Sequence, residues 1–190
     1  SMVIQLDEPL ADPAPLNVAF ISELARSNDI KVLLSGSGGD DIFTGYRRHR
    51  AIKLDQYVSL LPSSCLSYME KLTENLDPTV TAYRRLAKLF SGASLKGDER
   101  IVNYFRWIKH RDIHPLFSPS FKLALAADVA ESPMYNFLAQ LPSGLSSLDR
   151  MLALEQRFFL ADHNLNYTDK MAMASGIEVR VPLLDEQLMQ

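Results

Sequence analysis

The sequence predicts an α/β fold that is predominantly helical, with part of a doubly wound parallel sheet near its N-terminal end. Two observations support this prediction. The apolar run 30–34 is too short for a helix and is typical of a strand. Three glycines within four residues follow it, and then two adjacent carboxylates head a helical pattern. A helix, a buried strand and another helix form one repeat of a doubly wound fold, in which ligands bind beyond the carboxyl ends of the strands.

The first 45 residues contain this repeat. Three prolines and three acids within residues 7–15 favour an extended segment that ends at a helix start, because proline fits the first helical turn. Apolar residues recur at helical spacing over 16–24, so we expect this helix to pack on the sheet. The strand 30–34 is apolar on both faces, which predicts helices on both sides of it.

Beyond Tyr46 the pattern is helical. Helices are expected over residues 54–61, 79–90, 100–110, 121–127, 132–141 and 148–160, with Asp77-Pro78 as cap and first turn of the second and Ser146 with Asp149 as a capping box for the last. Trp107 lies near the apolar stripe of its helix and is expected in the core.

The last 30 residues combine a polar run with regular elements. Residues 162–167 are too polar for a core, and a helix is expected from Asp169 to Gly176. In the alternating pattern that follows, Glu178 and Arg180 share a face, where an internal ion pair would brace the segment.

Composition indicates an ordinary globular protein, since 47% of the 190 residues are hydrophobic and 23% are charged. The net charge of -3 argues against nucleic acid as a partner, because nucleic-acid surfaces normally need a basic face. A single cysteine, Cys65, rules out an internal disulfide framework and suits a reducing compartment. No apolar run approaches about 18 residues and no signal peptide is evident, so we expect a cytoplasmic protein without a membrane partner.

The loop 35–41 has the chemistry of a nucleotide site. Glycines let the backbone take positive φ and let a ligand approach the main-chain N–H groups, and the positive end of the following helix favours an anion. Asp40 and Asp41 would repel phosphate unless a cation lay between them, which points to Mg²⁺. A plain helix N-cap is the alternative role for Asp40. The loop matches neither G-x-x-x-x-G-K-[ST] nor G-x-G-x-x-G, so it is not that of a P-loop NTPase or a dinucleotide-binding fold.

Three stretches, in the expected order, resemble motifs of the asparagine synthetase family. Residues 35–46 resemble its second nucleotide loop, S-G-x-G-G-D-E-x-F-x-G-Y, and residues 6–13 resemble D-E-P-x-x-D-P. Residues 169–185 resemble D-[RK]-x-[SA]-M-A followed by E-x-R-x-P-x-L-D. The resemblance implies the C-terminal synthetase domain of this family, an adenine-nucleotide α-hydrolase of pyrophosphatase-loop (PP-loop) type. It covers residues 6–46 and 160–186 by motif, whereas the helical middle matches only in character.

The resemblance also implies a reaction. ATP would activate a carboxylate, aspartate in the family's namesake, as an acyl adenylate with release of pyrophosphate, and ammonia from glutamine would displace AMP. By motif match, the nucleotide-binding residues would be Ser35, Gly36, Ser37, Gly38 and Gly39, the Mg²⁺ ligand Asp40, and the supporting residues Asp41, Lys170, Glu178 and Arg180. No residue is assigned as catalytic.

Three residues depart from the family pattern. Ser37 stands where the family usually has an acid and where β-lactam synthetases have a tyrosine that serves catalysis, and serine cannot act as the same acid or base. Tyr167 stands where many members have lysine. Asp41 replaces the more usual glutamate, which shortens its reach. Ser37 and Tyr167 leave open a related amidotransferase that closes a lactam or amidates a cell-envelope sugar or peptide.

Other family features do not occur in these 190 residues. They are the first loop, S-G-G-x-D-S, which grips the pyrophosphate, an N-terminal cysteine for glutamine hydrolysis, and a later lysine-bearing loop. We therefore expect a partial synthetase domain, inactive alone, that lacks the glutaminase domain and the first PP-loop of its parent chain.

The partial domain is expected to divide into an α/β nucleotide-loop segment over 1–50, a helical region over 51–160 and a returning active-site segment over 161–190. Missing strands would leave a sheet edge that a homo-oligomer could cover. A catalytically silent interaction domain of the same fold is the remaining alternative.

Overall fold

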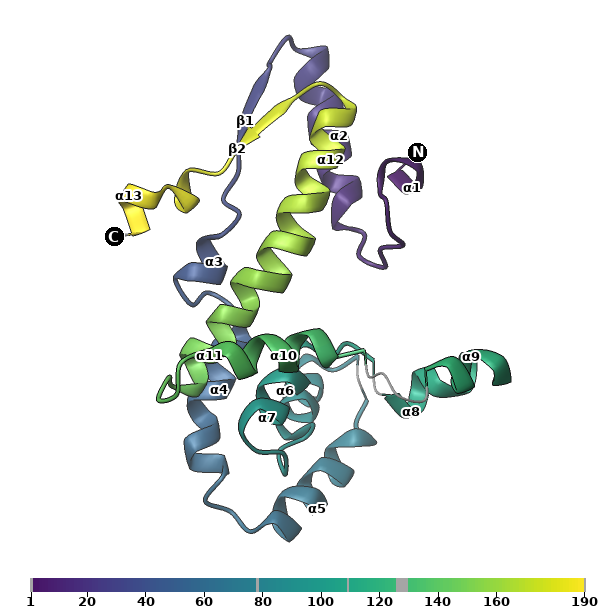
Figure 1. Ribbon diagram of the computed structural model, residues 1–190, viewed down its shortest axis with the longest axis vertical. Coiled ribbons are helices and arrows are strands. Elements are labelled where there is room, and N and C mark those ends of the chain that lie inside the picture. The colour runs from purple at the N-terminus through teal and green to yellow at the C-terminus, as the bar shows by residue number, and fades with distance from the viewer. Residues whose placement is uncertain (1, 78, 109, 126–129, 190) are drawn as a thin grey trace. The chain divides into compact units, whose positions relative to one another are not determined.

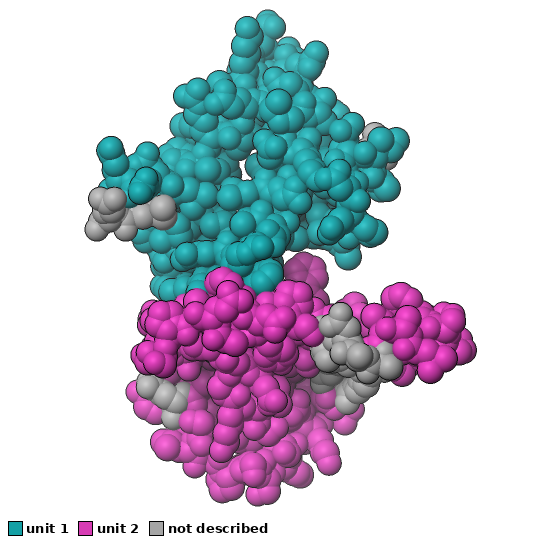
Figure 2. Space-filling view, in the orientation of Figure 1, with its two compact units in different colours: residues 1–45, 152–190 teal, residues 46–151 magenta. Residues whose placement is uncertain are grey.

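The structure of the protein, a computed structural model, describes residues 2–77, 79–108, 110–125 and 130–189 (Figure 1). The chain forms two compact units. Unit 1 combines residues 1–45 with 152–190, and unit 2 comprises residues 46–151 (Figure 2). Most described residues are helical and two strands form a small parallel sheet, so the expected, predominantly helical α/β character is confirmed.

Unit 1 contains the sheet. Its elements are α1 (Met2–Gln5), α2 (Ala14–Ser27), β1 (Val32–Leu34), α3 (Gly39–Ile42), the π-helix η2 (Glu155–Leu165), α12 (Asn166–Ala174), β2 (Glu178–Arg180), the 3-10 turn η3 (Pro182–Leu184) and α13 (Glu186–Met189). Pro15 lies in the first turn of α2, as its fixed φ favours. The polar run 162–167, expected between two helices, is itself helical.

The two strands pair in parallel, with Leu33 opposite Val179. These two residues pack on a small core formed by Ala25, Ala172 and Ile177. Helices α2 and α12 contribute the two alanines and lie side by side, which small residues at their contact allow (Figure 1). The pair of helices therefore covers one face of the sheet.

The other face of the sheet is open among the described residues, so the expected cover on both sides is wrong for this chain. Val32 is 38% exposed and Leu34 is 74% exposed. The strand is also shorter than the apolar run 30–34, because pairing with β2 includes only its last three residues. An apolar strand of this kind is normally buried on both faces, but α2 and α12 lie on the same side.

The regular elements described in unit 2 are all helices or helical turns. Its elements are α4 (Arg47–Val58), α5 (Ser63–Glu74), α6 (Thr81–Phe90), α7 (Gly97–Phe105), α8 (His110–Ile113), the 3-10 turn η1 (His114–Leu116), α9 (Pro119–Ala124), α10 (Ser132–Gln140) and α11 (Ser147–Leu154), whose last three residues belong to unit 1. The expected capping box forms, because the Ser146 hydroxyl donates to the Asp149 carboxylate at 2.7 Å and accepts from its backbone N–H at 3.2 Å.

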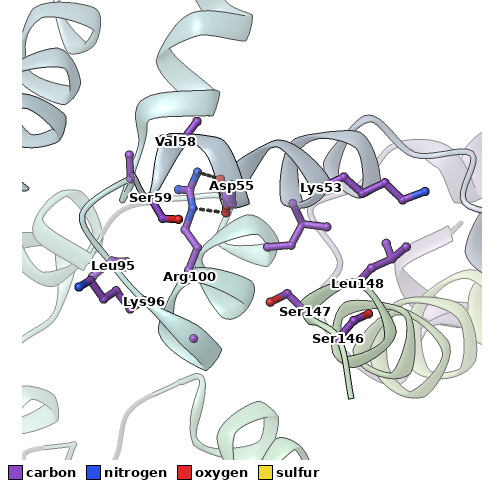
Figure 3. Close-up of a pocket in the computed structure, with 13 residues that line it drawn as sticks. Lys53, Asp55, Val58, Ser59, Leu95, Lys96, Arg100, Ser146, Ser147 and Leu148 are labelled. Carbon is purple, nitrogen blue, oxygen red and sulfur yellow. Dashed lines mark hydrogen bonds and ion pairs between the residues drawn. The ribbon is translucent and has the colours of Figure 1, made fainter. Parts of the chain in front are cut away.

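A buried ion pair holds α4, α6 and α7 together (Figure 3). The Arg100 guanidinium donates to both carboxylate oxygens of Asp55, at 2.7 and 2.9 Å, and to the carbonyls of Leu89 and Ser91 at 2.8 and 2.6 Å. The Tyr104 hydroxyl donates to the same carboxylate at 3.0 Å. Only 5% of the Arg100 side chain and 16% of the Asp55 side chain are exposed. Because the charges are paired and hydrogen-bonded, the unit can bury them.

Trp107 is not in the core. Helix α7 ends at Phe105 instead of continuing to residue 110, so Trp107 falls in the following connection and is 67% exposed. Of the other expectations, Pro78 and the end of the helix expected over 121–127 lie outside the described residues. Within the described ranges, no helix is both long enough and apolar enough to span a membrane.

Candidate nucleotide-binding site

The glycine loop starts where the sheet ends. The backbone N–H of Ser35, directly after β1, donates to the carbonyl of Arg180 at the end of β2, at 2.8 Å. The Ser35 and Ser37 hydroxyls share a hydrogen bond of 2.8 Å, and the Ser37 N–H donates to the Ser35 hydroxyl at 3.2 Å. Gly38 then takes a left-handed φ of 88° before α3 begins. The side chains of Ser35 and Ser37 thus stabilise the turn, so a ligand would meet a preorganised backbone.

The P-L-L-D segment, residues 182–185, packs against this loop through its two leucines. A Cβ atom on Gly38 would lie 2.7 Å from Leu184 Cγ, and one on Gly39 would lie 2.8 Å from Leu183 Cδ1. Both glycines are therefore needed for close packing, and Gly38 is also needed for its left-handed backbone. Gly36 differs, because no heavy atom lies within 4 Å of the position of its Cβ. The open side of the loop is at Gly36.

The two adjacent carboxylates have different surroundings. Asp40 is exposed and Asp41 is buried, although both belong to the first turn of α3. Gly45 donates its N–H to the Asp40 carbonyl at 3.0 Å and leaves room for the Asp40 carboxylate, since its Cβ would lie 2.5 Å from Asp40 Cγ. Asp40 is thus open to a ligand in solution, whereas Asp41 is turned into the protein.

Asp40 has no cluster of metal-binding side chains around it among the described residues. The described residues bring together no group of three or more His, Cys, Asp or Glu side chains that could hold one. Mg²⁺ commonly binds through one or two carboxylates completed by phosphate oxygens and water. Asp40 beside a glycine loop fits this pattern of Mg²⁺ bound together with a nucleotide.

The other sequence-predicted residues lie in two places. Lys170 on α12 pairs with Asp7, so it joins the N-terminal acidic segment and not the glycine loop. Arg180 Nε donates to Glu178 Oε1 at 2.8 Å, which is the expected ion pair, and this contact raises the pKa of Arg180. Both side chains are more than half exposed, so the pair adds little stability. Its segment meets the loop through the Arg180 carbonyl.

A family model described as asparagine synthase matches residues 1–190. This chain belongs to the asparagine synthase family. It is 31% identical to putative glutamine-hydrolysing asparagine synthetases of Mycobacterium bovis and Mycobacterium tuberculosis, over 98% of this chain and 27% of each relative. It is 25% identical to the glutamine-hydrolysing asparagine synthetase 1 of Bacillus subtilis, over 97% of this chain and 28% of that relative. The chain therefore spans little more than a quarter of these relatives' length. No solved structure matched it.

The motifs that resemble the asparagine synthase family come together in unit 1, apart from Tyr46 at the unit boundary. The pairing of β1 with β2 brings the end of the chain to the glycine loop. The ion pair of Lys170 with Asp7 brings the D-E-P segment to α12. No pattern in the sequence predicts the contacts of Leu183 and Leu184 with the loop. Two adjacent glycines and two adjacent leucines within motifs of one family are compatible with such contacts.

The cavities of ligand size among the described residues include one in each unit. One, of about 660 Å³, lies in unit 1 between residues 6–10 and the 161–170 stretch of η2 and α12, and Lys170 lines it. The other, of about 710 Å³, lies in unit 2 between α4, residues 93–100 and residues 146–148 (Figure 3). None of the sequence-predicted site residues lines the cavity of unit 2.

Proposed function

We propose that this chain is part of the synthetase domain of an ATP-dependent ligase that forms an amide from a carboxylate, as its family membership suggests. The main structural support is the glycine loop at the end of the parallel pair, open at Gly36 and followed by the exposed carboxylate of Asp40. In this proposal the phosphates of ATP contact residues 35–39, and Asp40 holds Mg²⁺.

The proposed reaction transfers an adenylyl group and then forms an amide. A carboxylate oxygen of the acceptor attacks the α-phosphorus of ATP, and the bond to pyrophosphate breaks. Ammonia then attacks the acyl carbon, loses a proton, and AMP leaves. Mg²⁺ would neutralise the charge of the pyrophosphate. The chain itself would orient the nucleotide through the loop N–H groups, because positioning and charge stabilisation supply most of such catalysis.

The proposed reaction has two candidate acceptors. Aspartate is the first candidate, because the relatives that the chain matches are named as asparagine synthetases. Ser37 favours a second candidate, which is another carboxylate in a lactam-forming or envelope-modifying reaction. The Ser37 hydroxyl is hydrogen-bonded to the Ser35 hydroxyl and cannot act as a strong acid or base, as the residue usual at this position could.

We further propose that the whole domain has a doubly wound PP-loop fold and acts with a glutaminase domain in the cytoplasm, and that the isolated chain does not turn over. The open face of β1 and the quarter share of the relatives' length support a larger domain around this chain. The missing S-G-G-x-D-S motif supports the lack of turnover, since half a phosphate site should bind ATP weakly.

ATP–pyrophosphate exchange by the full-length parent chain tests the proposal. Exchange that requires Mg²⁺ and aspartate is the expected result. Exchange with only another carboxylate would favour the second acceptor. Its absence with every acid tested would contradict the ligase function and favour the silent interaction domain.

A further inference from the structure

Two leucines of the turn η3 pack directly on the backbone of the glycine loop. Leu184 occupies the space beside Gly38, where three of its side-chain carbons lie within 3.3 Å of the position that a Cβ would take. Leu183 does the same for Gly39, with its Cδ1 2.8 Å from the corresponding position. Both leucines are half-buried. The loop therefore rests on side chains that lie almost 150 residues later in the chain.

The charged side chains of this later segment bond within the segment. Glu178 pairs with Arg180, and Asp185 accepts the backbone N–H of Gln187 in α13 at 2.9 Å. The hydrogen bond that joins the segment to the loop comes from the main chain, because the Arg180 carbonyl accepts the Ser35 N–H at 2.8 Å. The stretch that resembles E-x-R-x-P-x-L-D thus supports the loop with leucine side chains and one carbonyl.

The loop keeps two backbone donors free. Among the described residues, the N–H groups of Gly36 and Gly38 have no acceptor. The Ser37 N–H between them donates to the Ser35 hydroxyl at 3.2 Å, and the Gly39 N–H donates to the Gly36 carbonyl at 3.3 Å. Free N–H groups in such loops bind phosphate oxygens, and the left-handed backbone of Gly38 sets the direction of its own N–H. The side chain packed on Gly38 therefore controls a candidate phosphate donor.

We propose that Leu184 is a positioning residue for ATP binding, because its side chain holds the left-handed backbone of Gly38 and with it the free donors of the loop. The inference rests on the proposed function, in which residues 35–39 contact the phosphates of ATP. Leu184 acts through the loop and needs no contact with the nucleotide. Without its side chain, Gly38 would regain alternative conformations, since glycine loses more conformational freedom on folding than any other residue.

Equilibrium binding of ATP with Mg²⁺ to the full-length parent chain, measured by isothermal titration calorimetry, tests this role. Leu184→Ala should raise the Kd for ATP about tenfold, since a displacement of about 1 Å in a positioned group can cost up to about a hundredfold in activity. Leu184→Met, which conserves volume, should bind within about twofold of the wild type. The control is Leu188→Ala on α13, where the side chain is 55% exposed, and it should bind as the wild type does. If Leu184→Ala does not fold, Leu184→Val takes its place with a smaller rise.

Two further readouts separate positioning of the loop from a general loss of structure. In ATP–pyrophosphate exchange, Leu184→Ala should raise the KM for ATP and leave the KM for the carboxylate within about twofold. Hydrogen exchange in the same variant should be faster at the Gly39 amide. It should be unchanged at the Ile177 amide, which donates to the Ala172 carbonyl at 3.0 Å and precedes β2 at the end far from the loop.

Four results would overturn the proposal. They are an unchanged Kd for ATP in Leu184→Ala, an equal rise in Leu188→Ala, no recovery with methionine, and equal acceleration at Gly39 and Ile177. If the wild type binds ATP but shows no pyrophosphate exchange with any acid, the proposed ligase function fails, while the Kd values still decide the role of Leu184. If the wild type binds no ATP, both fail.

Discussion

Replacing Gly45 by alanine should displace the Asp40 carboxylate. A Cβ atom there would overlap Asp40 Oδ1 and lie 2.5 Å from Asp40 Cγ and 3.0 Å from its Cα. The Cα belongs to the backbone, and the carbonyl of Asp40 accepts the N–H of Gly45 at 3.0 Å, so the side chain has to yield. Since unbonded carbons rest about 3.5–4.0 Å apart, the carboxyl carbon would move by about 1 Å or more.

A shift of this size would matter for a metal ligand, because ligand distances in metal sites are held within about 0.2 Å. We expect Gly45→Ala to need about 10 to 100 times more Mg²⁺ for half-maximal ATP–pyrophosphate exchange in the full-length chain, as changes around metal ligands do. It should also lose about 1–3 kcal/mol of stability through overpacking.

Two further variants make this test specific. Asp40→Asn should reproduce the Mg²⁺ effect without the steric clash. Gly36→Ala should leave the free energy of unfolding nearly unchanged, because no atom lies within 4 Å of its added Cβ. If Gly45→Ala has wild-type Mg²⁺ dependence and stability, the assignment of Asp40 as the ligand beside Gly45 is refuted.

Three other predictions concern stability, each measured by urea unfolding. Arg100→Ala should lose about 3–5 kcal/mol, because it leaves the buried carboxylate of Asp55 without its ion-pair partner. Arg180→Ala, which breaks an exposed ion pair, should lose about 1 kcal/mol or less. Equal losses in the two variants would contradict the importance of the buried ion pair. Gly38→Ala should lose about 1–3 kcal/mol, because φ at this residue is 88° and Leu184 occupies the space of the new methyl group. Adding Leu184→Ala to the same chain should recover part of this loss. A neutral effect of Gly38→Ala would contradict the packing of Leu184 on the loop. Burial, and to a smaller extent Asp55, raise the pKa of Tyr104 above its ordinary value of 10.0. As pH rises, the unfolded state therefore loses this proton before the folded state does, so the stability of the wild type should fall beyond about pH 10. Tyr104→Phe should show a smaller fall, and an identical pH dependence would contradict the raised pKa.

The parts of the fold that could be predicted from sequence are local. The strand, the glycine loop and the acidic start of α3 are neighbours in the chain, so composition and spacing were sufficient. The pairing of β1 with β2 was not predicted, because it joins Leu33 to Val179 across the whole of unit 2 and no local pattern encodes it. The expectation that helices cover both faces of β1 is wrong because apolar residues at 32 and 34 indicate only that the strand can be buried. They do not indicate which helices are present to cover it.

For the candidate site, residue types were easier to predict than partners. The Ser35 to Asp40 loop was assigned from its glycines and acids, and its role in binding stays a prediction. The partner of Lys170 was not assigned, since Asp7 lies 163 residues away in sequence. No pattern in the sequence predicts that Asp40 is exposed and Asp41 buried, because both are adjacent acids in the first turn of the four-residue helix α3.

The central claim is that the glycine loop and Asp40 bind ATP with Mg²⁺ for carboxylate activation. The most direct test is ATP–pyrophosphate exchange by the full-length parent chain and its Asp40→Asn variant, with Mg²⁺, with aspartate or a panel of other carboxylates, and without added acid. We predict exchange that depends on a carboxylate and falls sharply in Asp40→Asn at equal protein stability. Exchange that is absent with every acid, or equal in the two proteins, would contradict the claim.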